Sequence, residues 1–489
     1  MGTVRFFNTF SARLEEFKPL RPNEVGMYTC GPTVYDFAHI GNFRAFVFED
    51  LLRRFLEFKG FKVKHVMNIT DVDDKTIAGA RREGKKLEDF TEVYTKAFCE
   101  DLRRLNIFPP NVPHEPPRAT REIPAMVELI EKLIQKNLAY VSEGSVYYRV
   151  ANFPGYGKLS KKKLEQNIQG ARVDVDEYQK EEGADFALWK KEKVGEPAWD
   201  SPWGKGRPGW HIECSAMSMK YLGGTFDIHA GGEDLIFPHH ENEIAQSEGA
   251  TGVPFVRTWL HCRFLLVDGE KMSKSKGNFY TLRDLLQKGY DPLQVRYVLI
   301  SNHYRQPLNF TLQGLEAAKE ALGRLDDFYS RVTEGGRRRE EGGEKKEEGV
   351  GRKDEGQGKK IFQGALNRFD EALSNDLGIS EALAAVFDAL REANQEMDRG
   401  NFSASDLEHA QEFLQKIDSV LGLGIREDAK APPAVLELLK EREAARRKKD
   451  FGESDKIRNE IQREGWLVKD GKPGEPTQLK RKKRVWENV

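Results

Sequence analysis

The chain has 489 residues, a length that corresponds to about three domains of ordinary size. Its 78 Lys and Arg residues nearly balance its 79 Asp and Glu residues, so the net charge of −1 excludes a polycation. No apolar run approaches the roughly 18 residues that span a bilayer, and residues 1–17 lack the apolar stretch of a secretory signal. The four widely spaced cysteines argue against a disulfide framework and favour reduced thiols. Membrane, secreted and fibrous classes are thereby excluded, and we expect a cytoplasmic protein.

The first 300 residues alternate between strand-like and helical patterns. Short apolar runs are typical of buried strands, and between them lie amphipathic stretches with helical spacing. The strand-like runs are residues 25–30, 62–69, 224–228 and 259–267, and the helical stretches include 44–58 and 89–105. This alternation predicts an α/β fold with a Rossmann-type parallel sheet. Residues 121–204 interrupt the pattern with clusters of Lys and Glu, and we interpret them as an inserted subdomain.

Residues 312–428 have apolar side chains at helical spacing and are predicted to form a helical bundle. Residues 333–360 interrupt them, because 17 of these 28 residues are charged and eight are glycine. Such a segment buries too little apolar surface to offset the entropy of ordering, so we predict a disordered insertion.

Residues 431–489 carry 16 Lys or Arg against 11 Asp or Glu and are therefore basic in a neutral chain. A basic appendage of this kind is typical of polyanion binding, although a solvated helix face and a frayed tail explain the charge equally well. The predicted domain boundaries are 1–120 and 205–311 for the two halves of the catalytic domain, 121–204 for the insertion, 312–428 for the bundle and 429–489 for the C-terminal domain.

Residues 30–42, which read CGPTVYDFAHIGN, form the first candidate site. They follow a strand-like run and lead into a helical stretch, the position at which α/β sheets bind nucleotides. The imidazole of His39 and the amide of Asn42 can donate hydrogen bonds to phosphate, and Gly41 lets a ligand approach the backbone. The tetrapeptide HIGN is short, and a structural histidine in a turn is the alternative interpretation.

The second candidate site is the sequence KMSKS at residues 271–275, which lies between two glycine-containing turns. Two ammonium groups, those of Lys271 and Lys274, can close over a triphosphate and neutralise the charge that builds up on leaving pyrophosphate. A basic surface loop is the alternative, but a five-residue match after a strand is specific.

With these two signatures the chain resembles the class I aminoacyl-tRNA synthetases, and more narrowly the cysteinyl-tRNA synthetase family. Longer strings carry the narrower resemblance, namely YTCGPTVY at 28–35, NITDVDDK at 68–75, PGWHIECSAMSM at 208–219, FDIHAGGED at 226–234, FPHHENEIAQ at 237–246, RRKKDF at 446–451 and SDKIR at 454–458. Asn42 departs from the signature, because it stands where the second histidine of HIGH would be. The resemblance covers nearly the whole chain apart from 333–360 and the extreme C-terminus.

The resemblance implies a zinc ion bound by Cys30, Cys214, His239 and Glu243. From the residues alone this signal is moderate, because the two cysteines lie 184 residues apart and each alone reads as a small buried hydrophobe. Two thiolates, an imidazole and a carboxylate are legitimate zinc ligands. His240 is a second candidate, either as a ligand or as a neighbour of the ligands. Zinc would select cysteine over serine, because it favours a soft thiolate over a hydroxyl.

The resemblance also implies roles for individual residues at four other subsites. Those expected to contact ATP are His39, Gly41, Asn42, His229, Gly231 and Lys274. Those expected at the amino-acid pocket are Cys30, Thr70, Trp210 and Asp234, with core packing as the alternative for Thr70 and Trp210. Those expected to stabilise the transition state are His39, Asn42, Lys271 and Lys274. Those expected to contact tRNA are Arg442, Arg446, Arg447, Lys448, Lys449, Arg458 and Trp466, although a core position is favoured over base stacking for Trp466.

We therefore predict a monomeric ligase that joins L-cysteine to tRNA(Cys) through cysteinyl-adenylate, with ATP and Mg²⁺ as co-substrate and counter-ion. Two other functions stay open from the sequence. One is a ligase with the same core that joins cysteine to a small amino-sugar, and the other is a catalytically silent tRNA-binding protein. The basic C-terminal segment argues against the first, and the intact KMSKS sequence and zinc ligands argue against the second.

Overall fold

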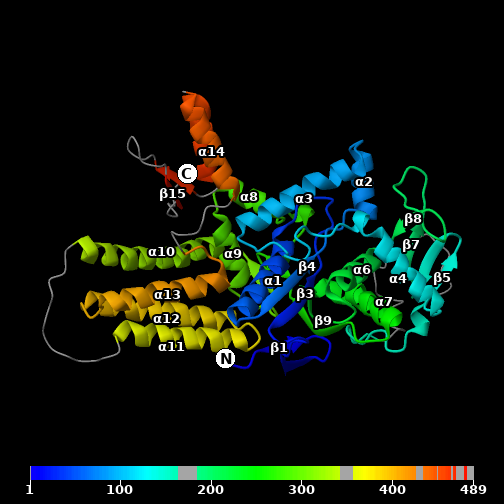
Figure 1. Cartoon of the computed structure of the whole chain (residues 1–489), viewed down its shortest axis with the longest axis horizontal. Coiled ribbons are helices and arrows are strands. Elements are labelled where there is room, and N and C mark those ends of the chain that lie inside the picture. Colours follow the sequence, from blue (N-terminus) through cyan, green and yellow to red (C-terminus); the bar gives the residue numbers. More distant parts are fainter. Residues whose placement is uncertain are drawn as a thin grey trace. The chain divides into compact units, whose positions relative to one another are not determined.

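The computed structural model describes residues 2–162, 184–341, 356–425, 433–448, 450–463, 466–469 and 478–481 (Figure 1). They form two compact units. The first unit comprises Met1–Leu286, Val298–Thr311 and Asp370–Ser380, and the second comprises Gln287–Tyr297, Leu312–Phe369 and Glu381–Val489. Among the described residues, no helix is both long and apolar enough to cross a bilayer.

A four-stranded sheet, parallel throughout, forms the centre of the first unit. Its strand order is β10-β9-β3-β4, and its strands are β3 (Glu24–Thr29), β4 (Lys62–Met67), β9 (Phe226–Gly232) and β10 (Val256–Cys262). Six of the seven residues of β9 are buried, as expected for a central strand covered on both faces. The predicted Rossmann-type α/β fold is thereby confirmed, although the predicted strand 259–267 is divided between β10 and β11 (Leu265–Val267).

Helix α1 (Ile40–Phe58) connects β3 to β4 and packs against the sheet. Phe43, Val47 and Leu51 are buried at helical spacing, which explains why this stretch forms a helix against the sheet. Arg44 is buried as well, and its guanidinium donates hydrogen bonds to the carbonyl oxygens of Leu299, Asn302 and His303. These bonds satisfy the two terminal nitrogens of a charged group whose burial would otherwise destabilise the core.

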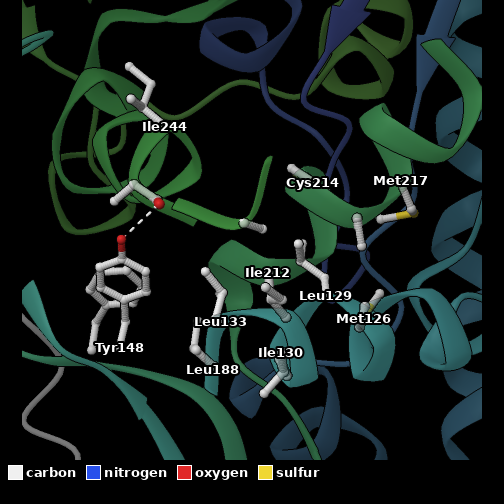
Figure 2. Packing of buried hydrophobic residues seen from close by; sticks show 14 of the residues in the cluster. Met126, Leu129, Ile130, Leu133, Tyr148, Leu188, Ile212, Cys214, Met217 and Ile244 are labelled. Atoms are coloured by element: carbon white, nitrogen blue, oxygen red, sulfur yellow. Dashed lines mark hydrogen bonds between the residues drawn. The ribbon is translucent and has the colours of Figure 1, made fainter. Parts of the chain in front are cut away.

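An antiparallel sheet with the strand order β5-β6-β7-β8 accounts for part of residues 121–204. Its elements and the helices beside it are α4 (Ile123–Gln135), β5 (Ala139–Ser142), β6 (Ser145–Tyr148), β7 (Phe186–Lys191), β8 (Gly206–Pro208), α6 (Trp210–Leu222) and α7 (Glu241–Thr251). Side chains of α4, α6 and α7 meet in one hydrophobic core, where the Tyr148 hydroxyl donates a 2.8 Å hydrogen bond to the carbonyl of Ala245 (Figure 2). Since these residues belong to the same compact unit as the parallel sheet, the boundaries 121–204 stay a prediction.

The remaining elements of the first unit lie outside the parallel sheet. They are β1 (Arg5–Asn8), β2 (Arg13–Glu16), α2 (Asp74–Arg82), α3 (Leu87–Arg104), β12 (Glu270–Lys271) and β13 (Leu308–Phe310). Helix α8 (Leu282–Gln287) ends at the boundary of this unit, and α9 (Pro292–Ile300) crosses it.

Long helices make up most of the second unit, as predicted for the bundle. They are α10 (Leu312–Glu341), α11 (Gln357–Ser374, with its last turn in the first unit), α12 (Ile379–Asp398) and α13 (Ala404–Leu421) (Figure 1). The ring of Phe362 contacts those of Phe328, Phe402 and Phe413. The prediction of disorder over 333–360 is wrong at both ends, because α10 continues to Glu341 and α11 begins at Gln357. Arg and Glu are good helix formers, so the charged residues extend a helix already nucleated by packing. Residues 342–355 lie outside the described part of the chain.

The C-terminal part of the second unit consists of two helices and a two-stranded antiparallel sheet. These elements are α14 (Pro433–Arg447), α15 (Phe451–Arg463), β14 (Trp466–Lys469) and β15 (Gln478–Arg481). A separate small core holds them together, formed by Val435, Ile457, Ile461, Trp466 and Val468.

Candidate active site and metal centre

The carboxyl ends of the parallel strands meet at one edge of the sheet, where ligands bind in open α/β folds. In the strand register, His229 on β9 lies opposite Tyr28 on β3 and Trp259 on β10. Cys30 directly follows β3 at this edge, and the connection from Cys30 leads to the start of α1. The strand order therefore places the residues after β3 and β9 beside the N-terminus of a helix.

Four side chains from distant parts of the chain converge at this edge. Cys30 comes from the connection after β3, Cys214 from α6, His239 from the short π-helical turn before α7, and Glu243 from α7. Their ligand atoms all lie within 4.8 Å of one another. The two Sγ atoms are 3.7 Å apart, Cys30 Sγ is 3.7 Å from Glu243 Oε1, and His239 Nε2 is 3.1 Å from the same oxygen.

These distances match the edges of a tetrahedron around one metal ion. A zinc–sulfur bond of about 2.3 Å places two tetrahedral thiolates roughly 3.8 Å apart, and bonds of about 2.0–2.1 Å place nitrogen and oxygen roughly 3.3 Å apart. The observed sulfur–sulfur and nitrogen–oxygen distances agree with these values within a few tenths of an ångström. Both the donor set and its spacing therefore fit zinc.

The electrostatics of this cluster divide the four donors. Burial raises the pKa of the Cys30 thiol well above its usual value. A hydrogen bond from Cys30 lowers the pKa of the Cys214 thiol to about 6. Burial by itself raises the pKa of the Glu243 carboxyl, but His229 and His239 lower that pKa to about 2. Burial by itself lowers the pKa of the His239 imidazole, but the nearby Glu243 and Cys214 raise that pKa to about 10. A thiolate and a carboxylate are thus available near neutral pH, whereas His239 must release a proton on binding a cation.

Other histidines surround the four converging side chains. His240 Nε2 lies 3.5 Å from Cys30 Sγ, and a second possible donor group consists of Cys30, His229, His240 and Glu243. However, His240 Nδ1 lies 2.8 Å from His261 Nε2, which ties this ring to β10. His239 makes the shorter contact with Glu243 Oε1, 3.1 Å against 3.9 Å for His240, and stays the first choice as ligand.

His211 received no role from the sequence, but the structure places its Nδ1 2.9 Å from Nδ1 of His239. A ring nitrogen in this position fixes the orientation of its neighbour. The ring of Trp210 also stacks on that of His239, with ring centroids 4.2 Å apart. Since both residues fall in the matched string 208–219, the string itself was the available signal.

The residues predicted to wall the amino-acid pocket lie around this cluster. Trp210 is 39% exposed although its ring stacks on His239, so one part of the ring faces solvent. Thr70 is buried, and its hydroxyl donates to Glu213 Oε2 at 2.8 Å and accepts from the Asn68 amide at 3.1 Å. Asp234 is exposed and follows β9 on a short 3₁₀ turn.

Asn68 and Gly31 show why the connection after β3 has its shape. The Asn68 side-chain oxygen accepts hydrogen bonds from the Gly31 amide at 2.9 Å and from the Tyr28 hydroxyl at 3.1 Å. A Cβ atom at Gly31 would lie 1.6 Å from the Asn68 carbonyl oxygen, so only glycine fits. The sequence strings contain both residues, but a positioning role for Asn68 was not foreseen.

The HIGN turn (residues 39–42) forms the N-terminal cap of α1. The backbone N–H of Asn42 donates a 3.2 Å hydrogen bond to Nδ1 of His39, and the backbone N–H of His39 donates a 3.1 Å hydrogen bond to Oδ1 of Asn42. This reciprocal cap leaves the positive end of the helix dipole at the sheet edge. Burial lowers the pKa of His39, so its imidazole is neutral at pH 7 and can still donate one hydrogen bond.

The KMSKS loop (residues 271–275) lies against the HIGN turn. The Ile40 amide donates a 3.0 Å hydrogen bond to the carbonyl of Tyr280 just beyond the loop, and a Cβ atom at Gly41 would come within 3.2 Å of Met272. Lys271 and Lys274 are both exposed on this loop. The two segments predicted to act on ATP, more than 200 residues apart in the sequence, are therefore neighbours.

Comparison with known proteins supports a single assignment. The family model described as "tRNA synthetases class I (C) catalytic domain" matches residues 16–320, the DALR domain matches 368–426, and "Cysteinyl-tRNA ligase anticodon binding domain" matches 428–475. The chain is 50% identical over 476 residues to cysteine–tRNA ligase of Solibacter usitatus, covering 96% of this chain and 98% of that protein. The chain belongs to the cysteinyl-tRNA synthetase family. The enzyme of Chlamydia muridarum is equally similar, with 50% identity over 480 residues and the same coverage.

Solved structures of other synthetases share the fold of this family member at low sequence identity. Mycobacterium tuberculosis methionyl-tRNA synthetase in complex with methionyl-adenylate gives a TM-score of 0.56 at 16% identity, covering 82% of this chain and 90% of that one. The Agrobacterium radiobacter LeuRS–tRNA–LeuAMS complex gives 0.58 at 12% identity, covering 84% and 85%. At this level of identity the likeness concerns the fold alone.

The C-terminal domain of this synthetase corrects two of the predicted tRNA contacts. Arg442 is 1% exposed and Trp466 is 6% exposed, and Trp466 packs in the small core of this domain. Arg442 on α14 is therefore not a surface contact in this conformation, and the core position favoured for Trp466 on β14 is confirmed. Arg446, Arg447 and Lys448 are exposed as predicted.

The remaining basic positions of the C-terminal domain stay predictions. Arg458 is half-buried, with a guanidinium Nε that is buried and has no hydrogen-bond partner among the described residues. Lys449 lies outside the described residues, and so does most of the basic segment 480–484.

Proposed function

We propose that this chain catalyses the ATP-dependent ligation of L-cysteine to tRNA(Cys). The observation that carries the proposal is the convergence of Cys30, Cys214, His239 and Glu243 at the sheet edge that also holds the HIGN turn. A thiol-recognising centre beside a phosphate-binding helix terminus is what activation of cysteine by ATP requires.

In the first step, a carboxylate oxygen of cysteine attacks the α-phosphorus of ATP, the bond from that phosphorus to the bridging oxygen breaks, and pyrophosphate leaves. Lys271 and Lys274 neutralise the growing charge on the leaving group, and His39, Asn42 and the terminus of α1 donate to the phosphates. Gly41, His229 and Gly231 are assigned to the ATP side of the site. No side-chain nucleophile is needed, because positioning and electrostatics supply the acceleration.

Cys30, Cys214, His239 and Glu243 would hold the zinc ion, and a zinc ion there would bind a substrate thiol as thiolate far better than a serine hydroxyl. The chain itself orients the rest of the amino acid. Thr70 and Trp210 border the pocket, and Asp234 is assigned to the substrate ammonium group.

In the second step, a hydroxyl of the terminal tRNA ribose attacks the activated carbonyl carbon, and AMP leaves. The exposed cations at 446–448 are assigned to the anticodon end, where Lys and Arg contact phosphates. We further propose that Mg²⁺ enters with ATP and that the protein acts as a monomer. The four free cysteines support a reducing compartment such as the cytoplasm.

The decisive experiment measures ATP-dependent incorporation of labelled cysteine into acid-precipitable tRNA, with serine as control. Cysteine incorporation without serine incorporation supports the proposal. Cysteine-dependent ATP–pyrophosphate exchange without transfer to tRNA would instead indicate a cysteine ligase with a small acceptor. Absence of both activities would indicate a silent tRNA-binding protein.

A further inference from the structure

An ion pair that no step above uses joins the two signature segments. The ammonium nitrogen of Lys274 lies 2.6 Å from Oδ2 of Asp36, a residue that precedes the HIGN turn. The other oxygen of this carboxylate accepts a 2.8 Å hydrogen bond from the backbone amide of Phe37. That bond fixes the carboxylate, so that Oδ2 faces the KMSKS loop.

Further contacts place the ammonium group of Lys274 beside the phosphate-binding turn. It lies 5.1 Å from the ring centroid of Phe279, and the ring of Phe279 packs edge-on against the ring of His39 with centroids 5.2 Å apart. Asp36 therefore sits next to both groups that face the triphosphate. Its charge is the one that ATP must displace from Lys274.

We propose that Asp36 is a displaceable counter-ion that holds Lys274 until the triphosphate of ATP replaces it, and that recaptures Lys274 as pyrophosphate leaves. This inference rests on the proposed function, because it assigns Lys274 to the phosphates. Asp36 is a positioning residue, since it acts through Lys274. The pair competes with the triphosphate for Lys274, so it weakens binding of ATP and of pyrophosphate without changing the barrier from the ATP complex.

The size of the effect follows from the exposure of the pair. The Lys274 side chain is 67% exposed and that of Asp36 is 39% exposed, so solvent screens most of the attraction. Replacing Asp36 with asparagine keeps the acceptor for the Phe37 amide and removes the charge. We expect Asp36→Asn to tighten binding of both ATP and pyrophosphate about two- to fivefold, as the loss of one exposed competing pair permits.

The same loop offers a matched control. Lys276 Nζ lies 2.8 Å from Glu270 Oε2, and these side chains are 54% and 60% exposed. Glu270→Gln therefore removes another solvent-exposed carboxylate–lysine pair, whose lysine lies two residues farther along the chain. Glu270→Gln should leave the affinity for ATP unchanged. Asp36→Glu retains the negative charge and should therefore bind ATP more weakly than Asp36→Asn does.

The test uses the full-length protein and equilibrium titration with α,β-methylene-ATP and, separately, with pyrophosphate. Tighter binding in Asp36→Asn but not in Glu270→Gln supports the proposal, together with a lower KM for ATP and a kcat that does not rise. Unchanged or weaker binding in Asp36→Asn, or equal shifts in both variants, would overturn it. Because the titration needs no turnover, it tests the role of Asp36 even if the wild-type protein is inactive. Inactivity would refute the proposed function alone.

Discussion

Replacement of Cys214 by serine tests the metal centre most directly. Cys214 is 1% exposed, and its sulfur lies 3.7 Å from that of Cys30, so a hydroxyl at this position still faces the same ligands. Structural zinc sites with four ligands bind with roughly 10–16 kcal/mol, which is about 2.5–4 kcal/mol for each ligand if they contribute equally. We therefore expect Cys214→Ser to weaken zinc binding by about 10²- to 10³-fold.

The assay is competition for zinc with a chelator of known affinity, with metal content per chain measured by mass spectrometry. Cys262→Ser is the matched control, because Cys262 is a free, 2% exposed thiol outside both possible donor groups. Each variant buries a hydroxyl in place of a thiol, so differences in folding stability largely cancel. Equal zinc affinity in the two variants would refute the assignment of Cys214, and metal removal should abolish cysteine activation in the wild-type protein.

Three further predictions follow from single features of the structure. Lys274→Ala should lower kcat for ATP–pyrophosphate exchange about 10²- to 10³-fold, because it removes one donor to the leaving group. The control Lys276→Ala should change kcat less than about twofold. Equal losses in the two variants would contradict a role of Lys274 at the leaving group. Burial and the Arg53 cation lower the pKa of His65 to about 3, so the unfolded chain binds a proton that the native state excludes between about pH 6.5 and 3. The free energy of unfolding should therefore decrease as the pH is lowered through this window, by about 2 kcal/mol from His65 at pH 5. Urea unfolding of His65→Gln at pH 7 and at pH 5 should lack this part of the decrease. Alanine at all three positions 446–448 should lower the slope of log affinity for tRNA against log salt by about 2–3, and an unchanged slope in a filter-binding titration would exclude phosphate contacts there.

The sequence by itself determined the alternation of strands and helices and the two signature segments. Runs such as those at β3 and β9 are mostly buried and predominantly apolar, which makes them recognisable without a structure. The HIGN turn is local as well, because His39 and Asn42 cap the same helix end through bonds that span three residues. Charge density alone misjudged the ends of α10 and α11, since the same residues that disfavour a core also favour a helix.

Only the tertiary structure decided which distant side chains meet and which faces are covered. Cys30 and Cys214 become neighbours because the strand order brings the end of β3 beside α6, and the pattern of residues along the chain contains no measure of that distance. Arg442 and Trp466 match tRNA-contact positions in the sequence, but both side chains are buried, and Trp466 packs in the small C-terminal core. The pairing of Asp36 with Lys274 likewise depends on the docking of two loops separated by more than 200 residues. Local patterns specify secondary structure, whereas long-range proximity arises only when the packed sheet fixes where each connection ends.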